Sequence, residues 1–136
     1  MSATKPYDSA RKDGIIVSHK MAAGAKIFAG TIVCVNGSGY ALAGSDTSGL
    51  KMAGVAYETA DNTNGAAGDK SVRVYTKGTF AFADSGAVQG DVGKVFYIAD
   101  DKTVTNASTT AGIAAGVCVA NESPTLTRIR IDGKTI

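Results

Sequence analysis

The sequence has no tryptophan, only two prolines and two cysteines, and a single histidine among its 136 residues. One histidine cannot supply the ligand set of a zinc site, and neither Cys34 nor Cys118 has a second cysteine at C-x-x-C spacing. The sequence therefore predicts no structural metal and no bound cofactor. His19 ends an apolar run and is interpreted as an ordinary strand-end residue. Both cysteines lie within apolar runs, IVCV and GVCV, which predicts two buried free thiols in a reducing compartment.

Long hydrophobic runs and strong charge are also missing. No apolar run approaches the length of a membrane span, and the first residues, MSATKPYDSARKDG, contain no hydrophobic signal segment. We therefore expect no membrane partner and synthesis in the cytoplasm. The formal net charge is only +2, whereas binding to a polyphosphate requires several clustered cations. Nucleic acid is not expected as a partner.

Glycine is abundant, with 17 residues, and it punctuates short runs rich in β-branched and aromatic side chains. No window of eleven or more residues has a helical stripe without a glycine. The pattern predicts an all-β fold, a small β-barrel or sandwich of jelly-roll-like type. The predicted strands are residues 15–19, 30–36, 39–43, 50–58, 70–78, 79–83, 94–99, 102–105, 113–120 and 126–132.

Residues 1–14 have neither a strand nor a helix period and contain five charged side chains, so they are predicted to form an irregular N-terminal arm. Residues 15–136 are predicted to form a single all-β domain, because the chain length is that of one domain. Alternation predicts that Val72 and Val74 face the core and Arg73 faces solvent, because successive side chains of a strand leave opposite faces. In the same way, Arg128 and Arg130 are predicted to share a solvent face.

Two runs, TIVCV and KVFYIA, are apolar on both faces. In an antiparallel protein such a strand is either central and covered on both sides, or covered by another subunit. The second alternative makes KVFYIA a candidate self-association strand. Its residues are Val95, Phe96, Tyr97 and Ile98.

An internal repeat relates the two halves of the chain. Residues 30–35 (GTIVCV) align with 93–98 (GKVFYI), 54–56 (GVA) with 116–118 (GVC), and 72–74 (VRV) with 129–131 (IRI). The second copy is shorter between its last two strands. The repeat predicts two similar β units packed around one pseudo-twofold core, since two copies are too few for a solenoid.

No catalytic constellation is evident in the sequence. Asp100 and Asp101 are the best candidates for an acid/base pair, but they fall where a turn is expected, and an aspartate in a turn usually binds its own backbone. A small hydrolase is thus the least favoured class, and the chain is not expected to be an enzyme.

The order of segments 23–43 (AGAKIFAGTIVCVNGSGYALA), 45–83, 91–105 (DVGKVFYIADDKTVT) and 114–132 (AAGVCVANESPTLTRIRID) resembles the small β-rich cement, or decoration, proteins of tailed-bacteriophage capsids. The resemblance covers about residues 15–132 in texture and strand order, and carries no catalytic signature. It implies an oligomeric all-β protein that binds the outside of an icosahedral shell and bridges subunits of the major capsid protein. The implied location is the outer capsid surface of the virion, after synthesis in the host cytoplasm.

The expected partners are thus the major capsid protein and the chain itself, as a homodimer or homotrimer. Candidate contacts are Pro6, Tyr7, Arg11 and Lys12 of the arm, together with Arg128 and Arg130. The alternative function is a carbohydrate- or receptor-binding β module of a phage surface or fibre. The absence of tryptophan disfavours this alternative, because such modules usually present exposed aromatic platforms.

Overall fold

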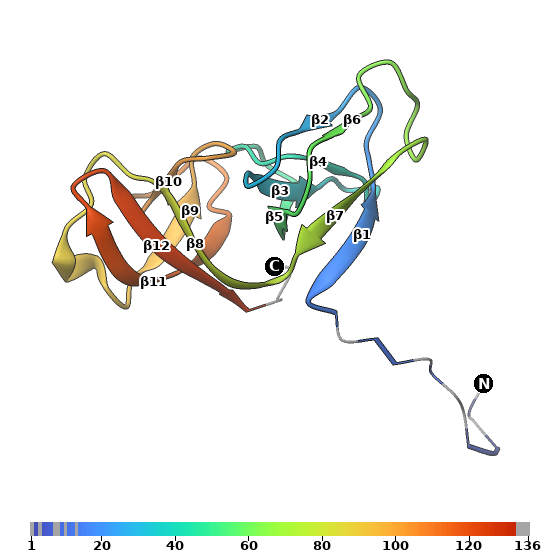
Figure 1. Ribbon diagram of the computed structural model, residues 1–136, viewed down its shortest axis with the longest axis horizontal. Coiled ribbons are helices and arrows are strands. Elements are labelled where there is room, and N and C mark those ends of the chain that lie inside the picture. Colours follow the sequence, from blue (N-terminus) through green and yellow to red (C-terminus); the bar gives the residue numbers. More distant parts are fainter. Residues whose placement is uncertain (1, 3, 7–8, 10, 13, 133–136) are drawn as a thin grey trace.

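The computed structural model describes residues 2, 4–6, 9, 11, 12 and 14–132. These residues form two five-stranded sheets and one two-stranded sheet (Figure 1). The first sheet contains β1 (Ile16–Lys20), β3 (Ile32–Val35), β4 (Ala41–Ala43), β5 (Lys51–Ala56) and β7 (Ser71–Tyr75). The second contains β8 (Lys77–Ala83), β9 (Val95–Ile98), β10 (Val104–Thr105), β11 (Ala114–Ser123) and β12 (Leu126–Asp132). β2 (Lys26–Ile27) pairs with β6 (Ala60–Asp61), and a short 3-10 helix, η1, spans Gln89–Asp91.

The prediction of an all-β fold is confirmed, and every predicted run contains a strand. Only β2 and β6 were not predicted, because two residues are too few to show alternation. The predicted faces are also correct. Val72 and Val74 are fully buried while Arg73 is exposed, and Ile129 is buried while Arg130 is exposed.

Each five-stranded sheet curls into a small, partly open barrel. In the first sheet, Met21, just after β1, forms an isolated parallel bridge with Ala41 of β4. In the second, Ala83 of β8 forms the corresponding bridge with Thr103, next to β10. These bridges bring the two edge strands of each sheet together at one end. Each barrel is built from one contiguous half of the chain, unlike the Greek-key exchange of strands between sheets in a jelly roll.

The internal repeat is visible in the strand order. The first sheet runs β1-β7-β5-β3-β4 and the second, read from its β8 edge, runs β8-β12-β11-β9-β10. Backbone hydrogen bonds are repeated as well: the amide of Gly30 donates to the carbonyl of Ala56 at 2.9 Å, and that of Gly93 donates to the carbonyl of Cys118 at 2.8 Å. The alignments of 30–35 with 93–98 and of 54–56 with 116–118 therefore hold in three dimensions.

The third alignment needs a correction of two residues. Val55 pairs with Tyr75, whereas its counterpart Val117 pairs with Arg130. The equivalent of Tyr75 is therefore Arg130, and the equivalent of Arg73 is Arg128. The original alignment of VRV with IRI still predicted the buried and exposed faces correctly. The reason is that a shift of two residues leaves every side chain on the same face of a strand.

Equivalent glycines mark a bulge in each barrel. Gly54 pairs with Val33 and Gly116 pairs with Phe96, and the register shifts beside each of these pairs. A Cβ atom on Gly54 would lie 2.0 Å from the carbonyl oxygen of Tyr75, and one on Gly116 would lie 2.3 Å from that of Arg130. Neither position has room for a side chain, because the neighbouring backbone occupies that space.

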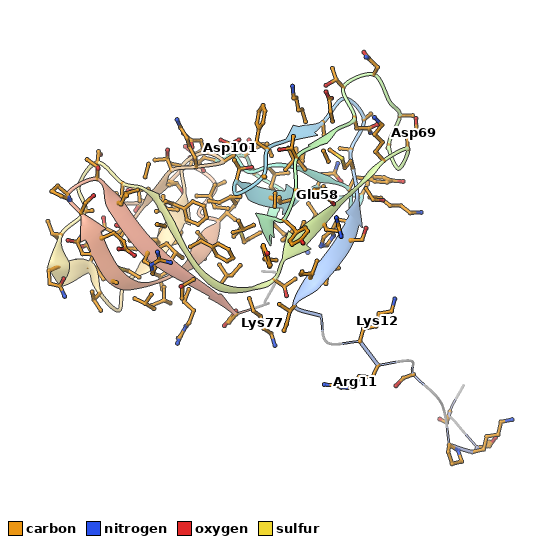
Figure 2. All side chains as sticks on the ribbon, viewed as in Figure 1. Arg11, Lys12, Glu58, Asp69, Lys77 and Asp101 are labelled. Atoms are coloured by element: carbon orange, nitrogen blue, oxygen red, sulfur yellow. The ribbon has the colours of Figure 1, made fainter. Side chains whose placement is uncertain are left out.

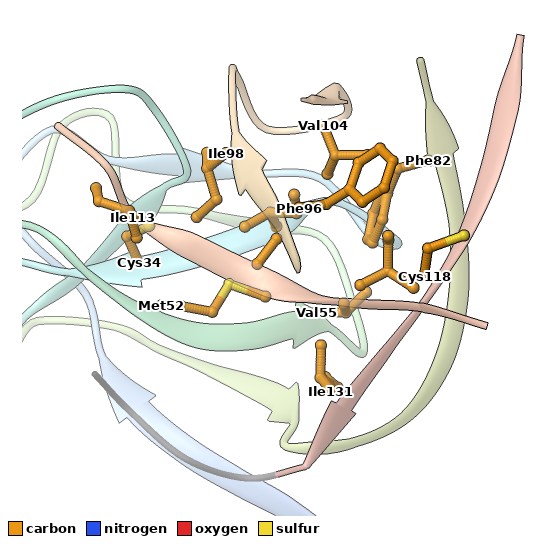
Figure 3. Packing of buried hydrophobic residues seen from close by; sticks show 13 residues of the cluster. Cys34, Met52, Val55, Phe82, Phe96, Ile98, Val104, Ile113, Cys118 and Ile131 are labelled. Carbon is orange, nitrogen blue, oxygen red and sulfur yellow. The ribbon is translucent and has the colours of Figure 1, made fainter. Parts of the chain in front are cut away.

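Two clusters of buried side chains fill the molecule. The first barrel encloses Met21, Ile27, Val33, Ala41, Ala53, Ala56, Val72 and Val74. The larger cluster, the shared core, lies inside the second barrel and includes Phe82, Phe96, Ile98, Val104, Cys118 and Ile129 (Figure 3). Four residues of the first sheet also belong to the shared core: Ile32, Cys34, Met52 and Val55.

The shared core is not pseudo-twofold, which corrects the prediction from the repeat. A twofold core would take equivalent residues from both units, but Ile32 and Cys34 contribute to it while their equivalents Val95 and Tyr97 do not. The outer face of the first sheet instead closes the interior of the second barrel. The two halves are therefore stacked with opposite faces in contact.

The length difference between the repeats fits this stacking. β2 and β6 pair next to the interior of the first barrel, where Ile27 is fully buried and Ala60 packs against the cluster. The equivalent β11–β12 connection lacks this extension. The interior of the second barrel is consequently available to the outer face of the first sheet.

Both cysteines are free and buried, as predicted. Burial raises the pKa of the Cys34 thiol to about 11, and it raises the pKa of the Cys118 thiol as well. Both side chains therefore act as small apolar groups of the shared core.

Candidate interaction surface

The N-terminal segment leaves the body at the base of β1. Its described residues include Pro6, Arg11 and Lys12, all exposed and outside any strand, and Figure 2 shows Arg11 and Lys12 away from the two barrels. Tyr7 lies outside the described residues. The segment is anchored at its end by Thr76, whose amide donates to the carbonyl of Ile15 at 2.8 Å. The Thr76 hydroxyl also donates to the carbonyl of Gly14.

Two aliphatic side chains are exposed where this segment joins the first sheet. Ile15 is 51% exposed and Ile16 is 44% exposed. Exposed isoleucines next to an irregular terminal segment provide apolar area that a partner can cover.

The candidate self-association strand divides between two faces. Phe96 and Ile98 are fully buried in the shared core, so they cannot contact a partner. Val95 is 45% exposed and Tyr97 is half-buried on the opposite side. Only these two residues of the predicted set remain available, because alternation places one half of a strand inside the barrel.

The two candidate arginines of β12 also differ. The Arg128 guanidinium forms an ion pair with Glu122 and donates to the carbonyl oxygen of Thr79 at 3.3 Å and to its hydroxyl at 3.2 Å. Arg130 is exposed and lies on the row of residues that joins Val95 to Val117 across the sheet. Arg130 is thus the more accessible cation for a partner.

A groove of about 260 Å³ lies along this face of the second sheet. It is lined by residues 52–54 and 76 from the first half and by residues 95, 114–117 and 130–132 from the second. Most of this lining is apolar, with Arg130 and Asp132 contributing opposite charges. The groove therefore joins the exposed side of β9, β11 and β12 to the boundary between the two barrels.

An ordered polar cluster on the first sheet was not predicted. Arg73 binds Glu58 with two side-chain hydrogen bonds of 3.0 and 2.8 Å, and its guanidinium lies 4.7 Å from the ring centroid of Tyr57 (Glu58 is labelled in Figure 2). The ring of Tyr57 in turn meets Tyr75 edge-on at 5.2 Å. In the second barrel Arg128, the equivalent of Arg73, forms an ion pair with Glu122, which lies two residues beyond the position equivalent to Glu58. The only indication of the Arg73–Glu58 pair in the sequence is that a glutamate, Glu58, follows the Gly-Val run of residues 54–56.

The environment of Glu58 favours its ionised form. The side chain and the amide of Arg73 both donate to this carboxylate, which lowers the pKa of Glu58 from 4.5 to about 2. The same contacts raise the pKa of Arg73. A carboxylate with a lowered pKa stabilises the fold above its ordinary pKa, and this contribution is lost as the pH falls toward the folded value.

Replacing Glu58 with Gln is therefore expected to flatten the pH dependence of stability between about pH 5 and pH 2. The wild-type protein should lose this contribution in that window, whereas the variant lacks it at every pH. Urea denaturation at several pH values measures the slope, with Arg130→Gln as a control that removes an exposed arginine elsewhere. Equal slopes for wild type and Glu58→Gln would contradict the assignment.

A second cavity, of about 320 Å³, lies at the loop of residues 61–70. Its buried Asn62 holds the loop together: the side-chain amide donates to the carbonyls of Ala22 and Ala66, both at 3.0 Å. Asp61 accepts hydrogen bonds from Thr63, which is the turn role expected of such an aspartate. Most polar groups of this loop therefore bind one another, whereas the buried Oδ1 atom of Asn62 has no hydrogen-bond partner among the described residues.

Of the two candidates for an acid/base pair, Asp100 uses its carboxylate in the turn, as expected of an aspartate there. The Asp100 carboxylate accepts from the amide of Lys102 at 2.9 Å, and the carbonyl of Asp101 accepts from the amide of Ile32 at 2.7 Å. Within the described residues no group of three or more His, Cys, Asp or Glu side chains is placed to hold a metal ion. No helix of the described chain has the length and apolar character needed to cross a bilayer.

Comparisons of this chain with protein-family models, with curated proteins and with solved structures give no match. The functional assignment therefore depends on the residues and surfaces described above.

Proposed function

We propose that the chain is a capsid decoration protein that binds the outer surface of an icosahedral phage head and bridges subunits of the major capsid protein. The observation that carries this proposal is the combination of a barrel body with a terminal segment outside it, flanked by the exposed side chains of Ile15 and Ile16. The resemblance of residues 15–132 to cement proteins supports the same function.

The proposed mechanism is additive binding. A standard protein interface buries about 800 Å² on each partner, and many symmetry-related copies on one shell act together by avidity. Each copy that spans two capsid subunits resists their separation. The stabilisation of the whole head is then larger than the affinity of one copy indicates.

Co-sedimentation with expanded, DNA-free heads of the phage that encodes the chain tests this function. Saturable binding at a simple ratio to capsid subunits is the expected result. A folded protein that stays in the supernatant at all concentrations would rule out the decoration function.

Deleting residues 1–13 is expected to lower the occupancy of the heads, because the deletion removes Pro6, Arg11 and Lys12, whose exposed side chains are candidate contacts for the capsid. The deletion leaves Gly14 and Ile15, whose carbonyls accept from Thr76, in place. Circular dichroism of the truncated protein checks that the barrels are intact. Unchanged saturation by the truncated protein would show that the segment is not a contact.

The alternative, a carbohydrate- or receptor-binding module, has one observation in its favour. Tyr57 is 42% exposed within the aromatic group that also contains Tyr75 and Phe80. Arg73 already lies over the Tyr57 ring at 4.7 Å, which leaves less of the ring for stacking on a sugar. A glycan array distinguishes the two functions, since specific retention of a glycan that Tyr57→Ala abolishes would favour the module.

A further inference from the structure

Two asparagines of the chain, Asn36 and Asn64, are followed directly by glycine. An asparagine in this context can lose its side-chain amide without an enzyme, because the main-chain nitrogen of the next residue can reach the side-chain carbonyl carbon. Glycine has no Cβ to obstruct that approach. The surroundings of the two asparagines differ, and the difference separates a protected position from a reactive one.

Asn36 is held in the turn between β3 and β4. Its side-chain oxygen accepts hydrogen bonds from the amides of Ser38 at 3.0 Å and Tyr40 at 3.1 Å. Its own amide donates to the carbonyl of Tyr40, and its carbonyl accepts from the amide of Gly39, both at 2.9 Å. The turn therefore has to open before the nitrogen of Gly37 can reach the side chain of Asn36.

The side chain of Asn64 has no such restraint. Asn64 is exposed in the loop that joins β6 to β7, and this loop projects beyond the strands of the first sheet (Figure 1). Within the described part of the chain, every other asparagine side chain makes a hydrogen bond, whereas that of Asn64 makes none. The amide of Gly65 donates to the carbonyl of Asn62 at 3.0 Å, so a single hydrogen bond holds the attacking nitrogen.

We propose that Asn64 is a site of spontaneous deamidation. The deprotonated main-chain nitrogen of Gly65 attacks the Cγ atom of Asn64 and forms a C–N bond. The bond from Cγ to Nδ2 then breaks, and ammonia leaves with the proton that the Gly65 nitrogen lost. Water opens the resulting cyclic imide at either of its two carbonyl carbons, which gives aspartate or isoaspartate. The net change is hydrolysis of one amide, and solvent water is the only co-reactant.

The isoaspartate product is expected to displace the loop. In this product the main chain runs through the side-chain carbons, which adds one carbon atom between residues 64 and 65. The backbone of Gly65 is closely packed, because a Cβ there would lie 1.9 Å from the Oδ1 atom of Asn62. The carbonyl of Gly65 also accepts from the amide of Gly24 at 3.3 Å. A longer chain at residue 64 therefore disturbs the contacts between this loop and residues 22–24.

The displaced contacts support the first barrel. The side-chain amide of Asn62 donates to the carbonyl of Ala22 at 3.0 Å, and its main-chain amide donates to the carbonyl of Ala25 at 2.8 Å. Ile27, in the adjoining β2–β6 pair, is fully buried in that barrel. Deamidation to isoaspartate is thus expected to lower the stability of the protein with time. This proposal does not depend on the proposed capsid function.

Peptide mapping by mass spectrometry tests the site, with the full chain incubated at mildly alkaline pH in water enriched in heavy oxygen. Asn64 is expected to be converted at least about tenfold faster than Asn36, because fewer hydrogen bonds must open first. Both products should contain one heavy oxygen, and chromatography separates isoaspartate from aspartate. The protein unfolded in urea is the control, since the two Asn-Gly pairs should then react at similar rates.

Urea denaturation of the incubated protein tests the effect on the loop. Chains that contain isoaspartate at residue 64 are expected to unfold at a lower urea concentration than fresh protein. Asn64→Gln is the matched variant, because glutamine keeps the amide but closes a ring much more slowly, and its stability should not change during the incubation. Asn64→Asp represents the other product and should be as stable as the wild type, because the residue is exposed.

Conversion at Asn36 that is as fast as at Asn64 in the folded protein would overturn the proposed site. No conversion at Asn64 under conditions in which both asparagines react in urea would overturn it as well. Isoaspartate at residue 64 without a loss of stability, or an equal loss in Asn64→Gln, would overturn the displacement of the loop. A preference for Asn64 that disappears on unfolding, together with a loss of stability confined to the wild type, would establish both steps.

Discussion

Replacing Gly54 with Ala is expected to lower the free energy of unfolding by about 3 kcal/mol or more. The added Cβ would lie 2.0 Å from the carbonyl oxygen of Tyr75, and that oxygen belongs to the neighbouring strand rather than to a movable side chain. The φ angle of Gly54 is +152°, a conformation that residues with a Cβ rarely adopt. The clash and the backbone strain therefore add. Urea denaturation measures the change as a shift in midpoint.

Alanine substitutions of two further glycines provide comparisons for the loss of stability in Gly54→Ala. Gly116→Ala introduces a similar clash, with the carbonyl oxygen of Arg130 at 2.3 Å, but without positive φ, so a smaller loss of stability is expected. Gly37→Ala is the control, because a Cβ there meets nothing within 4 Å, and its effect should stay within about 0.5 kcal/mol. A Gly54→Ala variant as stable as Gly37→Ala would show that β5 can move away from β7.

The sequence predicted the strands well because most of them are half-buried. In β7 and β12 one face meets the core and the other meets solvent, so apolar and charged residues alternate and identify the faces without any structure. The repeat was also detectable, because the Gly-Val strands carry glycines at a bulge where a Cβ cannot fit. Because only glycine fits at these two positions, the same Gly-Val motif occurs in both halves of the chain.

The packing of the halves could not be predicted in the same way. The runs around Ile32 and Val95 are both apolar on two faces, yet one is covered by the second barrel and the other is not. Local pattern reports that a face is apolar, but not which part of the chain covers it. The pseudo-twofold prediction failed for this reason.

The candidate surface was predictable only in part. Val95 was identified from its strand, but Phe96 was included because the sequence does not show which side of an apolar strand faces the barrel. The pair of Glu58 and Arg73 was missed because 15 residues separate them in the sequence. The two residues come together only because β5 and β7 pair with each other. Such a contact depends on the register in which two strands pair, and not on the spacing of the residues along the sequence.

The stacked arrangement predicts a large effect at Ile32. Ile32→Ala is expected to cost about 2–5 kcal/mol, because it opens a cavity between the two barrels where the side chain is fully buried. Denaturation of dilute protein measures this loss and keeps any self-association out of the comparison.

Val55 and Val117 give the sharper comparison, because they are the same residue at equivalent positions of the repeat. Val55→Ala should cost about 2 kcal/mol, while Val117→Ala, at a half-buried site, should cost less than about 1 kcal/mol. A pseudo-twofold protein would respond equally at both positions. Equal losses would therefore contradict the stacking of the first barrel into the second, whereas unequal losses follow from the fact that only one of the two faces is covered within the chain.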